Sequence, residues 1–149
     1  MLTIQASAPA RIDLAGGTLD LWPLHVLHPG SVTVNLAIDR FAECRVRRAS
    51  EGLRIILRDR SVEKRADSAA ALLADPATAL VGSLLEALEI REPLEIEFWS
   101  GVPFGSGLGG SSALTVALMG ALGRVSPRDL TGVDRVDFVR PWHCARTFH

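Results

Sequence analysis

Four glycines and three serines lie in one short run between an apolar strand-like segment and an apolar helix-like segment. The run covers residues 103–113 and reads PFGSGLGGSSA. Glycine adopts positive φ and lets the backbone approach a ligand with no Cβ between them. A helix that begins after such a loop presents free N–H groups, which favour a bound anion, most often phosphate. The sequence therefore predicts a phosphate-binding loop.

The segments around this loop predict an α+β fold. Alternating or β-branched runs predict strands, and an apolar stripe at helical spacing, which includes Leu84 and Leu88, predicts a helix that starts at Asp75-Pro76. A run of small apolar residues predicts a second helix after the loop, ended by Gly123. The expected strands are 2–8, ended by Pro9, then 31–38, 41–47, 53–57 and 94–99; the second helix is 112–122, and residues 63–74 are either helix or loop.

Composition limits the class of protein. The chain has 149 residues, 48% of them hydrophobic, and a net charge of -1. This is a globular composition with no overall attraction to nucleic acid or to a membrane surface. Two cysteines make no disulfide framework, and the first ten residues do not resemble a secretory leader. We therefore expect a cytoplasmic protein that binds a small molecule and neither nucleic acid nor a membrane.

Two common nucleotide-binding loops fit the glycine run less well. A Walker loop requires a lysine after its last glycine, where this chain has Ser111. A dinucleotide fingerprint, G-x-G-x-x-G, is met by Gly105, Gly107 and Gly110. That motif normally lies in the first βαβ unit and needs a later strand that ends in an acidic residue. Asp129 lies at the expected separation of ~20 residues after the motif, but it follows no clear strand. This alternative therefore stays open and is disfavoured.

Two motifs together resemble the GHMP kinase family, which includes galactokinase, homoserine kinase and mevalonate kinase. Residues 103–113 are similar to the family's second motif, P-x-G-x-G-L-G-S-S-A, with Gly110 where many members have another serine. Residues 8–20, APARIDLAGGTLD, are similar to its first motif, and most of all to the form in heptose-phosphate and fucose-type sugar kinases. The resemblance covers residues 2–123 and places the motifs in the family's order.

This resemblance implies a fold and an activity. The fold is the N-terminal domain of the family, a mixed sheet with helices on one face and a βαβ crossover that carries the glycine loop. The activity is transfer of the γ-phosphoryl group of ATP to a sugar or sugar phosphate, with Mg²⁺. The loop residues implied to bind ATP are Pro103, Gly105, Ser106, Gly107, Leu108, Gly109, Gly110, Ser111 and Ser112, and Ser111 is also implied to bind the metal ion.

The first motif supplies the other implied site residues. Arg11 matches the family's basic residue near the transferred phosphoryl group, where a cation offsets developing charge; a surface salt bridge is the alternative. Gly17, Thr18 and Asp20 match the substrate-binding part of the motif, since a carboxylate accepts hydrogen bonds from sugar hydroxyls. Asp13 either joins them or holds the adjacent glycine turn. For the serines of the loop, the alternative is simple capping of the helix.

The family also implies a second domain with an acidic catalytic residue and a third glycine-rich motif, neither of which is recognisable here. We expect residues 1–125 to form the ATP-binding domain and residues 126–149 an irregular tail, produced by truncation or a shifted reading frame. A non-catalytic nucleotide-binding module or an inactive fragment on the same scaffold is the alternative function.

Overall fold

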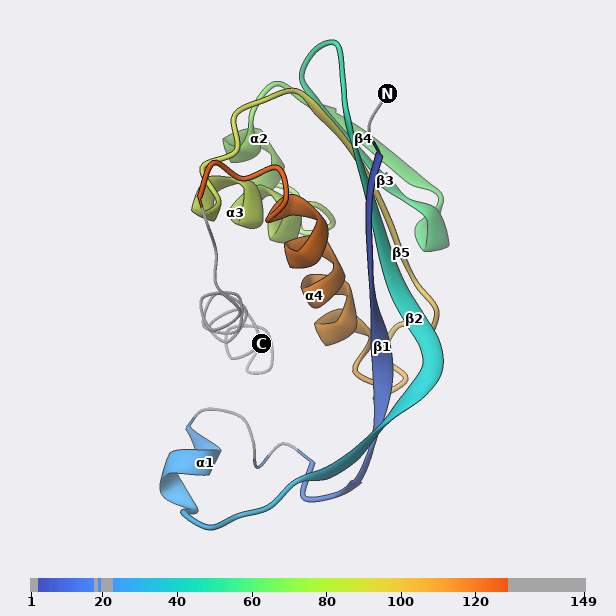
Figure 1. The fold of residues 1–149 in the computed structure, drawn as a ribbon, viewed down its shortest axis with the longest axis vertical. Helices are drawn as coiled ribbons and strands as arrows, with labels where there is room; N and C mark the ends of the chain where they lie inside the picture. The colour runs from blue at the N-terminus through green and yellow to red at the C-terminus, as the bar shows by residue number, and fades with distance from the viewer. Residues whose placement is uncertain (1–2, 18, 20–22, 129–149) are drawn as a thin grey trace.

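In the part of the chain that the structure describes, five strands form a single sheet, and the larger helices cover one of its faces (Figure 1). The computed structural model describes residues 3–17, 19 and 23–128. The strands are β1 (Thr3–Ala15), β2 (Val34–Arg48), β3 (Leu53–Leu57), β4 (Val62–Ala66) and β5 (Leu94–Ser100). The helices are α1 (Leu24–Leu27), α2 (Ala69–Leu73), α3 (Ala79–Ala87) and α4 (Gly110–Leu122), with a 3₁₀ turn, η1, at Arg58–Arg60.

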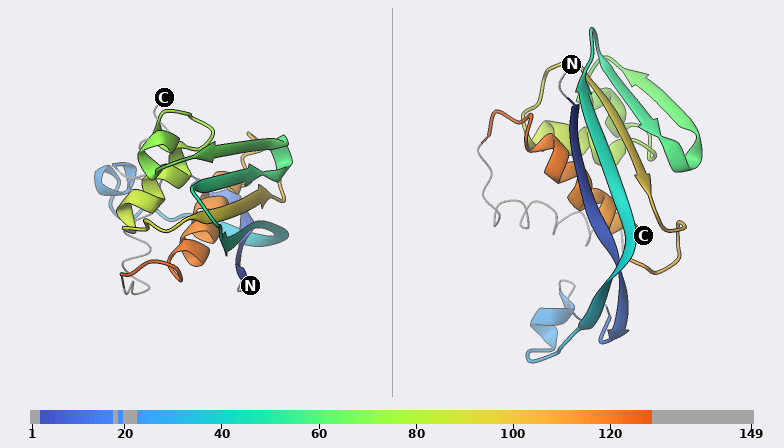
Figure 2. Two further views of the ribbon diagram at one scale, coloured as in Figure 1. Left: turned by 90° about the horizontal axis from the view of Figure 1, so that it is seen from above. Right: turned by 45° about the vertical axis from the view of Figure 1, so that its right-hand side comes forward.

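The strand order is β1-β2-β5-β3-β4, and the sheet is mixed, as predicted. The pairs β1–β2, β2–β5 and β3–β4 are antiparallel, whereas β3 and β5 are parallel. Parallel neighbours require a crossover connection, which here runs through β4, α2 and α3. The glycine loop follows β5, at the end of this crossover, and leads directly into α4. The predicted α+β class and the helices on one face are therefore confirmed (Figure 2).

The core lies between the sheet and the helices α2, α3 and α4. Alternate residues of β3 and β5 face it, and Ile55 and Ile96 are fully buried against helix residues such as Leu84 and Leu118. Cys44 of β2 lies in the same core, and burial raises the pKa of its thiol to about 12. This cysteine is a small apolar core residue and not a nucleophile.

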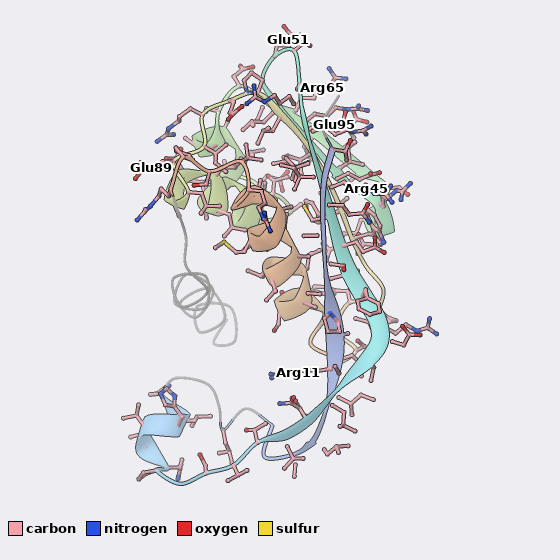
Figure 3. The ribbon with its side chains drawn as sticks, in the orientation of Figure 1. Arg11, Arg45, Glu51, Arg65, Glu89 and Glu95 are labelled. Carbon is pink, nitrogen blue, oxygen red and sulfur yellow. The ribbon has the colours of Figure 1, made fainter. Side chains whose placement is uncertain are left out.

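The opposite face of the sheet carries paired charges. Arg54 donates to both Glu63 and Glu95, and Trp99 lies beneath the guanidinium groups of Arg45 and Arg58, each 4.9 Å from its ring centre. Figure 3 shows Arg45 and Glu95 on this side of the sheet, away from α4. The charges pair with one another along neighbouring strands, which stabilises a face that no helix of the described residues covers.

Two predicted strand boundaries were wrong. Pro9 does not end the first strand, because β1 is an edge strand, and an edge position tolerates a residue that lacks an N–H. The strand continues to Ala15 with shifts in its pairing register between Pro9 and Arg11 and between Asp13 and Ala15. Its partner β2 (Val34–Arg48) is likewise one long strand, where the sequence predicted two strands at 31–38 and 41–47.

The helix boundaries also differ from the prediction. Residues 63–74 hold most of β4 and the short helix α2, rather than one helix or loop. The Asp75 carboxylate accepts from the Ala77 amide, so Asp75-Pro76 starts a turn, and the regular helix begins only at Ala79. The helix α4 begins at Gly110, two residues before the predicted start, and ends before Gly123 as predicted.

Candidate functional site

Three glycines in the left-handed region shape the loop between β5 and α4. Their φ angles are +76° at Gly105, +73° at Gly107 and +67° at Gly109. A Cβ at Gly105 or Gly107 would meet no described atom within 4 Å, so the requirement at these two positions is conformational. At Gly109 a Cβ would also lie 3.1 Å from Cγ of Arg11. The loop therefore needs its alternating glycines, and one of them also makes room for Arg11.

The N-terminus of α4 is built from backbone alone. Its N-cap residue is Gly109, and the first helical hydrogen bond runs from the Ala113 amide to the Gly109 carbonyl at 2.9 Å. The amides of Gly110, Ser111 and Ser112 therefore have no intrahelical acceptor. The first turn contains no acidic residue that would offset the positive end of the helix dipole. The alternative in which a serine caps this helix is not realised in the described structure.

The predicted loop residues differ in exposure. Pro103, Phe104, Ser106 and Ser111 are exposed, whereas Leu108 is half-buried. The Phe104 ring lies 4.6 Å from the guanidinium carbon of Arg60, on the 3₁₀ turn after β3. Residues 103–107 of the loop therefore face solvent, whereas residues 108–110 are partly buried against the domain.

One backbone hydrogen bond brings the two sequence motifs together. The amide of Arg11, on β1, donates to the carbonyl of Leu108 at 3.0 Å. The aliphatic part of the Arg11 side chain lies against Gly109, and the side chain projects toward the side of the sheet that carries α4 (Figure 3). A cationic side chain from the first motif therefore lies at the helix N-terminus formed by the second motif.

Arg11 also pairs with an acidic residue of its own strand. Its Nε lies 3.2 Å from Oδ1 of Asp13, and both side chains are partly exposed, at 37% and 28%. A partly exposed pair of this kind contributes at most about 1 kcal/mol to stability. The salt-bridge alternative for Arg11 is thus present in the structure, next to the loop. The sequence prediction missed this pairing, although residues two apart on a strand face the same side.

The glycine turn of the first motif, Gly16-Gly17, comes three residues after Asp13. Gly16 has a φ of +68°, and a Cβ on it would lie 2.1 Å from the carbonyl oxygen of Val32. Its own carbonyl accepts from the Thr33 hydroxyl at 2.8 Å and from the Leu19 amide at 3.1 Å. Gly17 lies beside Asp13. Of the predicted substrate residues, Thr18 and Asp20 lie outside the described residues.

Gly110 is required by packing. A Cβ there would lie 2.6 Å from Cγ2 of Val102 and 3.0 Å from Oγ of Ser100. The Ser100 hydroxyl itself donates to the Val102 carbonyl at 3.1 Å and accepts from the Val102 amide at 3.3 Å. These contacts were not predicted from the sequence. They explain why this chain has glycine where the motif it resembles often has serine.

A metal ion in this site would depend on the nucleotide. Among residues 3–17, 19 and 23–128, no three His, Cys, Asp or Glu side chains form a group that could hold a metal ion. Mg²⁺ commonly binds through substrate phosphates and keeps several waters, so few protein ligands are needed. The exposed hydroxyl of Ser111, in the first turn of α4, is a suitable oxygen donor.

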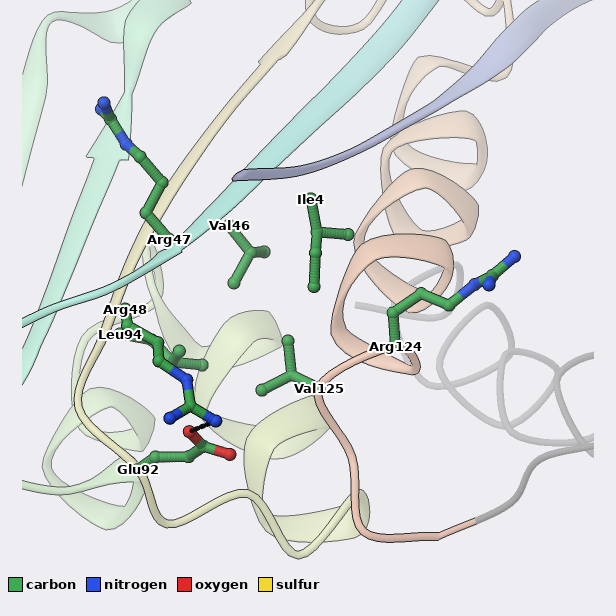
Figure 4. A pocket seen from close by; sticks show the side chains of 8 residues that line it. All are labelled: Ile4, Val46, Arg47, Arg48, Glu92, Leu94, Arg124 and Val125. Atoms are coloured by element: carbon green, nitrogen blue, oxygen red, sulfur yellow. Dashed lines mark ion pairs between the residues drawn. The ribbon is translucent and has the colours of Figure 1, made fainter. Parts of the chain in front are cut away.

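A small hollow lies at the other end of α4. It has a volume of about 180 Å³, and its lining includes Ile4, Val125 and the ion pair of Arg48 with Glu92, whose atoms are 3.0 Å apart (Figure 4). It is lined by residues of β1, β2 and β5, by Glu92, and by Arg124 and Val125 after α4, whereas the glycine loop lies at the N-terminus of α4. The hollow therefore belongs to no part of the site described above.

Comparison with known sequences identifies the family. The sequence model described as "GHMP kinases N terminal domain" matches residues 66–142, more than half of the chain. The match contains the glycine loop and begins after the first motif. A mevalonate kinase of Methanothermobacter thermautotrophicus is 51% identical over 49 residues, which are 33% of this chain and 16% of that protein.

Solved structures share the fold. A D-glycero-D-manno-heptose 1-phosphate kinase from Bacteroides thetaiotaomicron superposes with a TM-score of 0.75 at 23% identity, covering 93% of this chain and 46% of that one. The mevalonate kinase of Methanococcus jannaschii gives a TM-score of 0.71 at 15% identity, with 93% and 45% covered. The chain thus spans less than half the length of these relatives.

The packing around Gly110 leads to a testable prediction. Gly110→Ala should lower the free energy of unfolding by about 1–3 kcal/mol, because the new methyl group overlaps Val102. In a Val102→Ala background the same substitution should lower the free energy of unfolding much less, because Cγ2 of Val102 is then absent. Alanine also favours a helix by up to about 1 kcal/mol over glycine, which offsets part of any remaining cost. Urea denaturation of the unmodified chain, the two single variants and the double variant gives the coupling energy between the two positions. An equal cost in both backgrounds would contradict the steric explanation.

Proposed function

We propose that this chain, which belongs to the GHMP kinase family, binds the phosphates of ATP at its glycine loop as part of a small-molecule kinase. The observation that carries the proposal is the hydrogen bond from the Arg11 amide to the Leu108 carbonyl. It places a cation and a helix N-terminus at one point. Phosphoryl transfer depends mainly on positioning and on stabilisation of phosphate charge, which these groups supply.

In this proposal the backbone amides at the start of α4 bind the phosphates. The amides of Gly110, Ser111 and Ser112 are available there, and the positive end of the helix dipole adds to their attraction for an anion. The left-handed glycines let the loop wrap closely around the triphosphate. Arg11 offsets the charge of the outermost phosphate, where transfer occurs. The Ser111 hydroxyl would hold Mg²⁺, which would supply positive charge that offsets the charge of the phosphates.

We further propose that the acceptor is a sugar or a sugar phosphate. Residues 8–20 resemble the first motif of heptose-phosphate and fucose-type sugar kinases, and the heptose 1-phosphate kinase superposes on 93% of this chain. In this scheme Gly17, Thr18 and Asp20 bind the acceptor, with the Asp20 carboxylate accepting hydrogen bonds from hydroxyl groups.

The setting proposed for this activity is the cytoplasm, with no nucleic acid or membrane partner. A net charge of -1 supports this, because it provides no general attraction to polyanions. No helix within the described ranges is long and apolar enough to cross a membrane.

Nucleotide binding can be measured on the 149-residue chain itself. MgATP at about 100 times its Kd should stabilise the fold by about 2.7 kcal/mol, seen as a rise in melting temperature. Ser111→Ala should weaken MgATP binding about tenfold, because the hydroxyl oxygen that would contact the charged Mg²⁺–phosphate group is lost.

Ser83→Ala is the matched control, because the Ser83 hydroxyl donates to the Ala79 carbonyl within α3. It should leave MgATP affinity unchanged. If neither ATP nor ADP changed the melting temperature, the proposed function would be wrong. Binding without phosphoryl transfer to any acceptor would instead favour a non-catalytic nucleotide-binding module.

The acceptor class needs a separate measurement. With MgADP bound, sugars or sugar phosphates should raise the melting temperature further, whereas mevalonate and homoserine should not. Asp20→Asn should weaken sugar binding by about tenfold, because a charged acceptor is lost, and leave MgADP binding unchanged. Asp67→Asn, at an exposed site between β4 and α2, is the control. Stabilisation by mevalonate or homoserine alone would contradict the sugar assignment.

A further inference from the structure

The hollow at the C-terminal end of α4 combines an apolar interior with an ion pair at its edge. Val46 of β2 and Leu94 of β5 are fully buried there, whereas Ile4 and Val125 are partly exposed beside them. All four side chains are branched and aliphatic, so they offer water no hydrogen bonds. The interior of the hollow therefore favours an apolar group over water.

The volume of the hollow limits the size of its ligand. It is about 180 Å³, and an apolar cavity of about 150 Å³ in another protein is large enough to bind benzene. Sites for drug-sized ligands are larger, roughly 300–1,000 Å³. The hollow therefore accommodates one branched aliphatic group of about the size of a leucine side chain, and not a nucleotide.

The charged groups at the edge of the hollow have both signs. Nη2 of Arg48 lies 3.0 Å from Oε2 of Glu92, and the two side chains are 76% and 35% exposed. Figure 4 shows these charged ends meeting at the edge, whereas the guanidinium group of Arg124 points away from Ile4 and Val125. An ion pair this exposed contributes at most about 1 kcal/mol to stability. A ligand can therefore engage both residues at little cost to the fold.

We propose that this hollow binds a free apolar α-amino acid of about the size of leucine. Such a molecule carries a carboxylate, an ammonium group and an apolar side chain on one carbon atom. Its carboxylate pairs with Arg48 and its ammonium group with Glu92, while the side chain enters the apolar interior. Each of the four charges then has an opposite charge beside it. This proposal is separate from the phosphate-binding function and does not rest on it.

The need for both charges distinguishes a free amino acid from related ligands. N-acetyl-leucine has no ammonium group, leucinamide has no carboxylate, and a residue within a peptide has neither. Each of these keeps the apolar side chain but leaves one or both residues of the ion pair without a ligand partner. Glycine has both charges and no side chain to bury. These compounds therefore separate the contribution of the ion pair from that of the apolar interior.

An NMR titration of the 149-residue chain with leucine, in the absence of nucleotide, tests the assignment. The methyl signals of Val46, Leu94 and Val125 should shift with one dissociation constant. N-acetyl-leucine and leucinamide should bind about tenfold more weakly, because each loses an interaction with a charged group. Glycine should cause no shift, because it buries no apolar surface. No shift with leucine up to its solubility limit would overturn the proposal, as would equal affinity for leucine and both derivatives.

Substitutions in the ion pair identify which residue binds which charge. Arg48→Gln should weaken leucine binding about tenfold but should not weaken leucinamide binding, because leucinamide has no carboxylate. Glu92→Gln should likewise weaken leucine binding but not the binding of N-acetyl-leucine. Arg91→Gln is the matched control, because Nη1 of Arg91 lies 3.0 Å from Oε1 of Glu86 in an ion pair that does not line the hollow. Unchanged leucine binding by Arg48→Gln, or an equal loss in the control, would contradict the proposed contacts.

A variant that fills the hollow provides the last test. Val125 follows α4 and is partly exposed, so the larger side chain in Val125→Trp can occupy the hollow. Leucine binding should then be lost while the melting temperature is retained. Ile4→Phe is the second variant, to be used if Val125→Trp does not fold. Leucine binding with unchanged affinity in a folded variant of either kind would show that the ligand lies elsewhere and would overturn the proposal.

Discussion

The hydrogen bond between the Arg11 amide and the Leu108 carbonyl, 3.0 Å long, joins the edge strand β1 to the loop that precedes α4. Among the described strands β1 lies at the edge of the sheet, so this contact uses a backbone donor that an edge would otherwise expose to water. It also brings together two segments that are far apart in the sequence. The arrangement of cation, loop and helix N-terminus therefore depends on it.

Tight backbone packing supports the arrangement on both sides of that bond. Gly109 makes room for the Arg11 side chain, and Gly110 allows the first turn of α4 to rest on Val102. These two glycines are needed for different reasons, one for a left-handed φ and a close contact, the other for the close contact alone. A site that binds phosphate through backbone amides needs such fixed positions, because amide direction cannot be adjusted by side-chain rotation.

Local sequence predicted the parts of this domain and missed their connections. The glycine loop, the strand before it and the helix after it follow from propensity and periodicity over neighbouring residues. Strand pairing beyond Pro9, the contact of Asp13 with Arg11 and the packing of Gly110 on Val102 depend on register and on residues brought together by folding. No single-sequence pattern encodes those distances. The family resemblance supplied the roles of the motif residues and left two alternatives for Asp13.

If both motifs form one phosphate-binding site, an NMR titration of the labelled chain with MgATP will detect them as a unit. The amide signals of residues 107–112 and the Nε–H signal of Arg11 should shift together with one dissociation constant, and tripolyphosphate should reproduce much of the effect. A response confined to one motif would contradict it. So would a response centred on the hollow beside Arg48 and Arg124 at the far end of α4.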